Sequence, residues 1–291
     1  MARSDISRRQ FVYAASAALL ARPLRLRAQA GPTAREVVDR IKRHVGIPWN
    51  DSTYRDTFKV GNPGARVTGI ASTFMSTLDV IQRAKGAGLN FIITHEPTFW
   101  SDADVTTGLT DDPLYRLKVD YVEKNQMVVW RFHDHWHARK PDGIFAGWNR
   151  ALGWDRYVAP DNERRYLLPP TTLGAIATHV ASALQSRSVR VVGDPATPVR
   201  TVARGAHTLS GNMAVMPNAD ALLVSEAREW DSIEYARDTV LSGQAKGIIL
   251  VSHEAGEEAG MDECARWLRS FVAEVPVEFI PTRDLLWTPG A

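Results

Sequence analysis

The sequence predicts an α/β fold in which helices cover mixed, mostly parallel sheets. Short apolar runs alternate with amphipathic segments between residues 33 and 280, the pattern of strands alternating with helices. Hydrophobic residues make up 44% of the 291 residues, enough for one large domain or two small ones. A polar, proline-containing segment at 160–170 divides the pattern. We therefore expect an N-terminal lobe at 31–160 and a C-terminal lobe at 161–291, after a separate segment at 1–30.

The N-terminal lobe begins with an expected helix over 33–46. Val37, Val38, Ile41 and Val45 recur there at helical spacing. Glycines at 86 and 88 end a second expected helix, which starts at Thr77. The helices expected in this lobe span 33–46, 77–85, 113–125 and 144–152. The strands expected in this lobe span 67–71, 90–95 and 127–132.

The C-terminal lobe resumes the same alternation without a fixed-period repeat. Apolar runs, such as the one at 247–252, predict strands of a helix-covered sheet. The helices expected in this lobe span 173–185, 233–241 and 259–272. The strands expected span 188–192, 202–207, 219–225, 247–252 and 275–280.

Residues 1–30 have the features of an export signal. They hold six of the 35 Lys and Arg but one of the 33 Asp and Glu. The pair Arg8 and Arg9 precedes an apolar stretch at 11–20, and Ala-Gln-Ala follows at 28–30, as in a twin-arginine signal peptide. The stretch is too short for a stable membrane span. We expect export to the periplasm and a mature start near Gly31. The remaining chain is mildly acidic, which gives no electrostatic case for nucleic-acid binding.

Two histidine motifs directly follow apolar strands. His95 ends the strand expected at 90–95 and Glu96 follows it, at the strand end where ligands bind in open α/β sheets. His133, His135 and His137 follow the strand expected at 127–132. If that strand runs on, its period of two places the three rings on one face. A structural histidine or a surface patch is the alternative; a short histidine-rich tract favours metal binding.

The third motif also follows an expected strand. His253 and Glu257 are four residues apart, so they share a face if a helix starts there. Imidazole and carboxylate together suit zinc, manganese, iron or cobalt. Glu96 is able to bridge two such ions, which then activate a water molecule for attack. The isolated histidines are interpreted as structural: His44, His179 and His207.

Other kinds of site have less support. The sequence contains no G-x-S-x-G nucleophile motif and no glycine-rich phosphate-binding loop after a strand. Cys264 is the only cysteine, and we interpret it as a small buried side chain. Five tryptophans cluster in the first half, most of them expected in the core and some in a pocket wall: Trp100, Trp130, Trp136, Trp148 and Trp154.

The three motifs resemble those of the Ngg-interacting-factor-three-like family, the GTP cyclohydrolase I type-two homologues. That family has His-His-Pro after a strand, then His-x-Asn-x-Asp, and Gly-His-x-x-x-Glu near the C-terminus. The counterparts here are the motifs at 95–97, 133–137 and 252–257. Glu96 stands where the family has its second histidine, and His137 where it has the aspartate. The two exchanges keep the numbers of histidine and carboxylate ligands unchanged.

The resemblance implies two lobes, with two divalent transition-metal ions in the cleft between them, and a trimer or hexamer. Glu96 or Glu257 would bridge the ions or act as the general base. The expected function is a metal-dependent hydrolase acting on nucleotide-like rings, phosphoesters or amides. The alternative is a non-enzymatic periplasmic protein that stores, carries or senses a transition metal. The metal ligands that the resemblance implies are His95, Glu96, His137, His253 and Glu257. Additional residues near the ions are expected among His133, His135 and Glu226.

Overall fold

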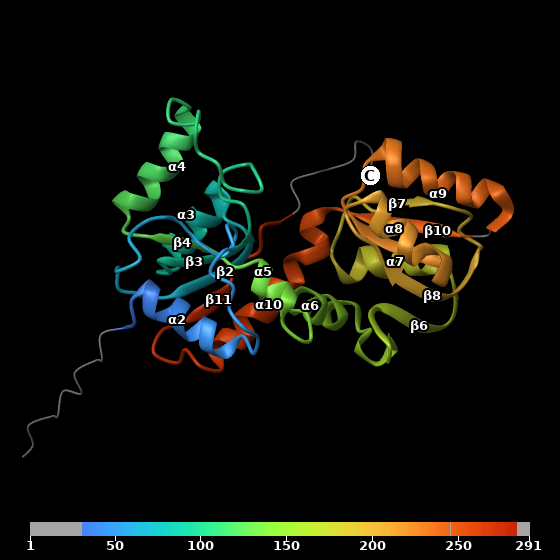
Figure 1. The fold of residues 1–291 in the computed structure, drawn as a ribbon, viewed down its shortest axis with the longest axis horizontal. Coiled ribbons are helices and arrows are strands. Elements are labelled where there is room, and N and C mark those ends of the chain that lie inside the picture. The colour runs from blue at the N-terminus through green and yellow to red at the C-terminus, as the bar shows by residue number, and fades with distance from the viewer. Residues whose placement is uncertain (1–30, 245, 284–291) are drawn as a thin grey trace, which may run out of the picture. The chain divides into compact units, whose positions relative to one another are not determined.

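The computed structural model describes residues 31–244 and 246–283 (Figure 1). The expected signal segment at 1–30 lies outside the described residues. The residues from Pro32 onward form one compact unit that contains two mixed sheets and the helices that cover them. The predicted α/β fold class is therefore confirmed. In the part that is described, no helix has the length and apolar character that crossing a lipid bilayer requires.

The first sheet has five strands, in the order β1-β4-β3-β2-β11. Its interior strands pair in parallel, and only the short edge strand β1 is antiparallel. The carboxyl ends of β2, β3 and β4 therefore lie along one edge. The strands are β1 (Phe58–Val60), β2 (Ile70–Met75), β3 (Phe91–Glu96), β4 (Val128–Arg131) and β11 (Val277–Phe279).

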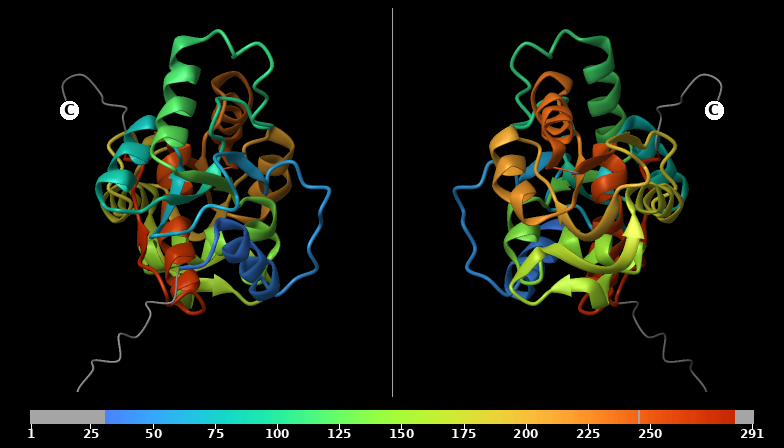
Figure 2. Two further views of the ribbon diagram at one scale, coloured as in Figure 1. Left: turned by 90° about the vertical axis from the view of Figure 1, so that its left-hand side faces the viewer. Right: turned by 90° about the vertical axis from the view of Figure 1, so that its right-hand side faces the viewer.

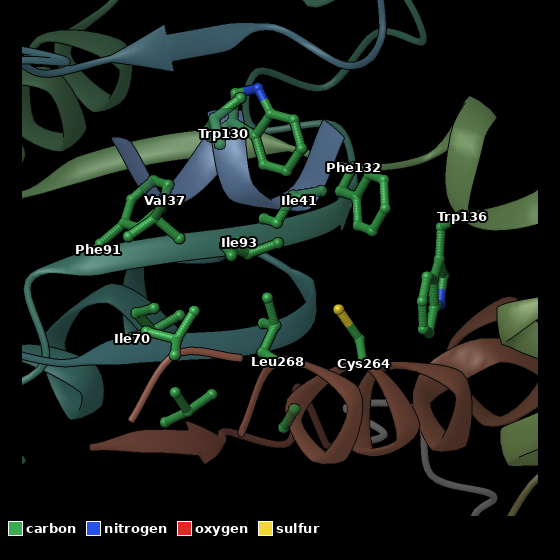
Figure 3. Packing of buried hydrophobic residues seen from close by; sticks show 14 of the residues in the cluster. Val37, Ile41, Ile70, Phe91, Ile93, Trp130, Phe132, Trp136, Cys264 and Leu268 are labelled. Atoms are coloured by element: carbon green, nitrogen blue, oxygen red, sulfur yellow. The ribbon is translucent and has the colours of Figure 1, made fainter. Parts of the chain in front are cut away.

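Helices cover both faces of this sheet because alternate strand residues point to opposite faces. Helices α2 (Ala34–His44) and α10 (His253–Arg269) pack against Ile70, Phe91 and Ile93. Figure 3 shows Val37 and Ile41 of α2 and Cys264 and Leu268 of α10 around these side chains. Helices α3 (Leu78–Gly86) and α4 (Pro113–Lys124) cover the other face. Both views in Figure 2 keep α4 and α2 on opposite sides of the strands.

The second sheet has six strands, in the order β5-β6-β8-β9-β10-β7. Strands β8, β9 and β10 are parallel, and the flanking strands are antiparallel to them. Helix α7 (Leu173–Ala183) packs on one face, and α9 (Glu234–Thr239) on the other. The strands are β5 (Val158–Ala159), β6 (Asn162–Thr172), β7 (Arg190–Val192), β8 (Pro198–Arg204), β9 (Ala221–Ser225) and β10 (Gly247–Val251).

Helix α10 links the two sheets. Ala255 in its first turns belongs to the core of the second sheet, whereas Met261 and Leu268 belong to the core of the first. It packs closely on α6 (Gly143–Leu152): a Cβ at Gly147 would meet the carbonyl oxygen of Ala259 at 2.1 Å. Glycine at 147 therefore permits the approach, which holds α10 beside both sheets.

Several sequence-based expectations are corrected here. The segment 160–170, expected as a divider, is most of β6, a strand of the second sheet. Strand β11 pairs with β2, so the last strand of the range 161–291 completes the sheet of the range 31–160. Helix α10 begins at His253 rather than at 259, because Ser252 caps it by accepting the N–H of Ala255 at 3.1 Å.

Apart from β6, the elements that the sequence did not predict are short. They include β1, α5 (Asp134–Ala138) and α8 (Leu209–Val215). Single turns of 3-10 or π-helix complete the described chain: Asp155–Tyr157, Met216–Asn218, Glu229–Ile233 and Val240–Gln244. Such short segments carry too little periodicity to be recognised from sequence.

Candidate metal centre

Histidine and glutamate side chains from both sheets meet at the carboxyl ends of the strands. His95 and Glu96 are the last residues of β3. His253 opens α10 directly after β10, and Glu257 follows one turn later, as the spacing predicted. Parallel strands bring their carboxyl ends to one edge, which is where α/β proteins bind ligands.

The tract at 133–137 reaches the site as a helix and not as a strand. Asp56 accepts the backbone N–H groups of His133, Asp134 and His135 at 2.6, 2.9 and 2.9 Å. This carboxylate caps the N-terminus of α5, so β4 ends at Arg131. His133 and His137 are then one turn apart and share a face. The expectation that all three rings share a strand face is therefore wrong.

His135 is turned away from its two neighbours and both its ring nitrogens have partners. Its Nδ1 bonds to Asp56 at 2.5 Å, and its Nε2 accepts the backbone N–H of Asn50 at 2.8 Å. The ring also stacks on Trp49, with 3.6 Å between the ring centroids. With both nitrogens bonded, this imidazole has no lone pair to offer a cation.

Five other imidazoles are held by Nδ1, which leaves each Nε2 for the site. The Nδ1 atoms of His95 and His207 bond to the backbone carbonyls of Phe132 and Ser225. Carboxylates hold the other three Nδ1 atoms. The pairs are His133 with Asp134 at 3.0 Å, His137 with Asp142 at 2.9 Å and His253 with Glu226 at 2.7 Å. Partners of this kind fix the orientation of metal-binding histidines.

Four of these Nε2 atoms face two carboxylates, and His137 lies beside His95 and His133. Glu257 Oε2 lies 3.3 Å from His95 Nε2 and 3.1 Å from His253 Nε2, and its Oε1 lies 3.6 Å from His207 Nε2. Glu96 Oε1 lies 3.5 Å from His133 Nε2. Arg131 holds the other oxygen of Glu96, with 3.2 Å between Nη2 and Oε2. Each carboxylate therefore presents at least one oxygen to the imidazoles.

These side chains form overlapping sets whose donor atoms lie within 4.8 Å of one another. One set, called here the three-histidine group, is His95, His133 and His137. A second set, the histidine–glutamate group, is His207, His253 and Glu257. A third set joins them through His95, Glu96 and Glu257. Seven candidate ligands shared among overlapping sets are compatible with more than one divalent ion.

The buried polar atoms at the centre support a cation. His95 Nε2, His253 Nε2 and Glu257 Oε2 are buried and have no hydrogen-bond partner among the described residues. Burying polar atoms without partners is costly, so such atoms need an explanation. Nitrogen and oxygen lone pairs that face one another at about 3 Å fit a shared divalent cation. The residues present therefore fit the metal that the resemblance implies.

The electrostatics of the metal-free site divide the imidazoles. Burial disfavours a charge on His253, but Glu226 and Glu257 outweigh it and raise its pKa to about 10. Burial alone would raise the pKa of Glu257, yet the neighbouring histidines hold that pKa well below its usual range. Burial and the rings of His95 and His137 lower the pKa of His133. Protons therefore occupy part of the space that a cation would fill.

Two residues show what sequence reasoning captured and missed. Glu226, expected near the site, accepts from His253 with its backbone in the left-handed region at φ 57°. His207, interpreted as an isolated structural histidine, belongs to the histidine–glutamate group. Its position just after strand β8 was the available signal. The structure brings together all five ligands expected from the resemblance; that they bind metal stays a prediction.

The candidate ligands of both groups lie at a cleft of about 1200 Å³. The first sheet contributes Glu96, His133 and the loop after β3 to its lining, and the second sheet contributes the segments after β8 and β9. Arg204 is buried beside the centre, with Nη2 donating to the carbonyl of Gly256 at 3.2 Å. A cleft of this size admits a small molecule as well as an ion.

Comparisons with solved structures show the same fold. A Staphylococcus aureus hypothetical protein, SA1388, matches with a TM-score of 0.66 at 16% identity, covering 89% of this chain and 100% of that chain. The protein ybgI, of unknown function, has a TM-score of 0.67 at 20% identity, covering 87% and 100%. A Bacillus cereus protein related to NIF3 has a TM-score of 0.66 at 16% identity, covering 89% and 100%. At such low sequence identity, the structural likeness establishes the fold alone.

A search of curated proteins finds no match. The model of the Duf34/NIF3 (NGG1p interacting factor 3) family matches residues 32–284. This range holds all three histidine motifs and both sheets. The resemblance inferred from the motifs is confirmed, and the chain belongs to the Duf34/NIF3 family.

Proposed function

We propose that this protein is a hydrolase that uses two divalent transition-metal ions, of zinc, manganese, iron or cobalt. The observation that carries the proposal is the convergence of four imidazole Nε2 atoms on Glu96 and Glu257, with His137 beside His95 and His133, in an open cleft. Bound ions would act there as Lewis acids and lower the pKa of a water molecule.

Glu257 is suited to be the carboxylate shared by the two ions. Its Oε2 faces His95 and His253, whereas its Oε1 faces His207. The side chain is 4% exposed, so it is held in place between the two groups. Its lowered pKa means that it is ionised at neutral pH and ready to bind a cation.

Glu96 is suited to serve as both ligand and general base. Arg131 fixes its Oε2, and Oε1 is left facing His133 and lining the cleft. A carboxylate at the open side is placed to accept a proton from attacking water. We assign Glu257 to bridging and Glu96 to this proton transfer.

Metal analysis of the protein purified from its native compartment tests the proposal first. We expect about two transition-metal ions per chain, together with hydrolysis of a phosphoester or an amide that chelation abolishes and added metal restores. The principal alternative is a protein that stores, carries or senses a transition metal. Bound metal without hydrolysis over a broad panel of both substrate classes would favour this alternative.

We also propose export by the twin-arginine route, on the sequence of residues 1–30. Substituting lysine for both Arg8 and Arg9 in one variant should abolish the periplasmic pool of the protein. Immunoblots of periplasmic and cytoplasmic fractions measure this, with Arg22→Lys as a control of equal charge. Unchanged periplasmic yield in the double variant would show that the pair is not an export signal.

The resemblance further leads us to propose a homo-oligomer, a trimer or hexamer. Size-exclusion chromatography with light scattering measures its mass directly. A monomer at micromolar concentration would contradict this part of the proposal.

A further inference from the structure

Trp100, in the cleft, differs from the other four tryptophans between residues 100 and 154. Trp130, Trp136, Trp148 and Trp154 are at most 5% exposed and belong to the core, as expected from the sequence for most of the five. Trp100 is 55% exposed and lines the cleft, four residues after Glu96. A large apolar side chain left open beside a candidate metal centre is an informative exception.

Buried polar contacts hold the loop that carries Trp100. Asp104 Oδ1 accepts the backbone N–H groups of Thr98 and Phe99 at 2.7 and 2.8 Å. Asp104 Oδ2 lies 3.3 Å from the Nζ of Lys59, and both side chains are at most 5% exposed. The buried Lys118 donates to the carbonyl of Thr98 at 2.5 Å. These contacts therefore fix the backbone conformation of the loop that carries Trp100.

The backbone of this loop takes up strain. Trp100 has φ 55° and Asp104 has φ 51°, both in the left-handed region that residues with a Cβ rarely adopt. Such strain persists where surrounding contacts over-determine the conformation, and it clusters at ligand-binding sites. Here the result is an indole presented to the cleft.

The side of the cleft next to the first sheet carries apolar residues together with polar side chains such as those of Arg55 and Asp102. Met75, Leu78, Pro97 and Leu114 line the same cleft, and Leu114 is 48% exposed. Lys118 lies against the indole, with Nζ 5.4 Å from the ring centroid. The second sheet instead contributes polar residues to the lining: Arg164, His207, Thr208, Glu226 and Arg228. Most of the large apolar side chains of the lining therefore lie on the side of the first sheet, which suits a substrate with an apolar group at one end.

We propose that Trp100 is a stacking platform for a planar aromatic or heteroaromatic group of the substrate. The group to be hydrolysed then lies at Glu96 and His133, which line the same cleft as this platform. This inference rests on the proposed function, because it assigns a substrate class to the same site. Stacking on tryptophan suits flat rings, whereas an aliphatic group of equal size gains burial alone.

Three phosphonates that resist hydrolysis test the platform: phenylphosphonate, cyclohexylphosphonate and methylphosphonate. In calorimetric titrations of the metal-loaded protein, the phenyl probe should bind about tenfold more tightly than the methyl probe. The cyclohexyl probe should fall clearly short of the phenyl probe. Trp100→Ala should remove most of the difference between phenyl and methyl, and Trp100→Phe should keep much of it.

Trp230→Ala is the matched control, since Trp230 is 73% exposed and is not among the residues that line the cleft. It should leave all three affinities unchanged. Equal affinities of the wild type for phenyl and cyclohexyl probes would overturn the assignment of a planar group. If Trp100→Ala changes the mass of the oligomer without changing probe affinity, Trp100 belongs to a subunit interface and the platform is wrong.

A second readout does not depend on metal. The indole N–H resonance of Trp100 in a ¹⁵N spectrum is identified by its loss in Trp100→Ala. The phenyl probe at millimolar concentration should shift it by ring current, in metal-free as in metal-loaded protein, and the methyl probe should not. A shift in a protein that binds no metal would leave the platform standing and contradict the hydrolase. An unmoved resonance in protein that holds two ions would do the reverse.

Discussion

The three-histidine group and the histidine–glutamate group are both candidate metal sites, but their candidate ligands differ in charge. In the first group every candidate ligand is an imidazole, and the pKa of His133 is lowered by burial and by His95 and His137. In the second, the carboxylates of Glu226 and Glu257 raise the pKa of His253 to about 10. Burial disfavours a charge on His95, but Glu257 outweighs it and raises the pKa of His95, so the imidazoles beside a carboxylate attract a proton whereas His133 repels one. The two groups should therefore differ in how protons compete with metal.

The largest effect is expected when a central imidazole is removed. His95→Ala and His253→Ala should each weaken metal binding by more than about 100-fold, since losing a ligand costs more than losing its supporting partner. His95 belongs to the three-histidine group and to the set that joins it to Glu257, so its loss should empty the first group and weaken the second, whereas His253→Ala should spare the three-histidine group. Metal content per chain measures this, with circular dichroism to confirm that the chain stays folded.

The matched control is His135→Ala, from the same tract. Its ring bonds Asp56 and Asn50 and stacks on Trp49, so its loss should lower the melting temperature and leave the metal content unchanged. Full metal retention in His95→Ala would contradict the assignment of His95 as a metal ligand. Metal loss in a folded His135→Ala would contradict the assignment of His135 to packing alone.

A smaller effect is expected from the residues that hold the imidazoles. Glu226→Gln removes the charge that orients His253, and Asp142→Asn does the same for His137. Each substitution should lower the affinity for one of the two ions by about 10- to 100-fold. Competition with a chromophoric chelator measures both affinities separately. If both substitutions lowered the affinity for the same ion, the two groups would not be separate sites.

The smallest effect is expected from a change of one pH unit. The metal-free protein holds a proton on His253 at neutral pH because its pKa is raised to about 10, so binding a cation must release that proton. Affinity at the histidine–glutamate group should then rise by about tenfold per pH unit between pH 7 and 9. His133, whose pKa is lowered, is already neutral and adds no such dependence. Zinc titrations in buffers of different ionisation enthalpy count the released protons. Equal proton release by wild type and Glu226→Gln would argue against this origin.

Much of the site was visible in the sequence because its motifs are local. His95 and Glu96 end an apolar strand, and His253 and Glu257 lie one helical turn apart after another. Strand ends and i, i+4 spacing depend on neighbouring residues alone, so sequence reasoning locates them. The family and the α/β fold class followed from the same motifs and alternation.

Only the tertiary structure decided how the tract at 133–137 is used. Asp56, distant in sequence, caps α5 and converts an expected strand into a helical turn. This one contact pairs His133 with His137 and sends His135 into the packing against Trp49.

Tertiary structure likewise decided which lone histidine joins the site and which sheet each strand completes. His207 reaches Glu257 because α10 crosses between the sheets, and β11 returns to pair with β2. The local sequence sets what each segment is able to form and which chemical groups it carries. Contacts between segments far apart in the chain decide which of those groups face one another, because burial and hydrogen bonding are satisfied only in the assembled fold.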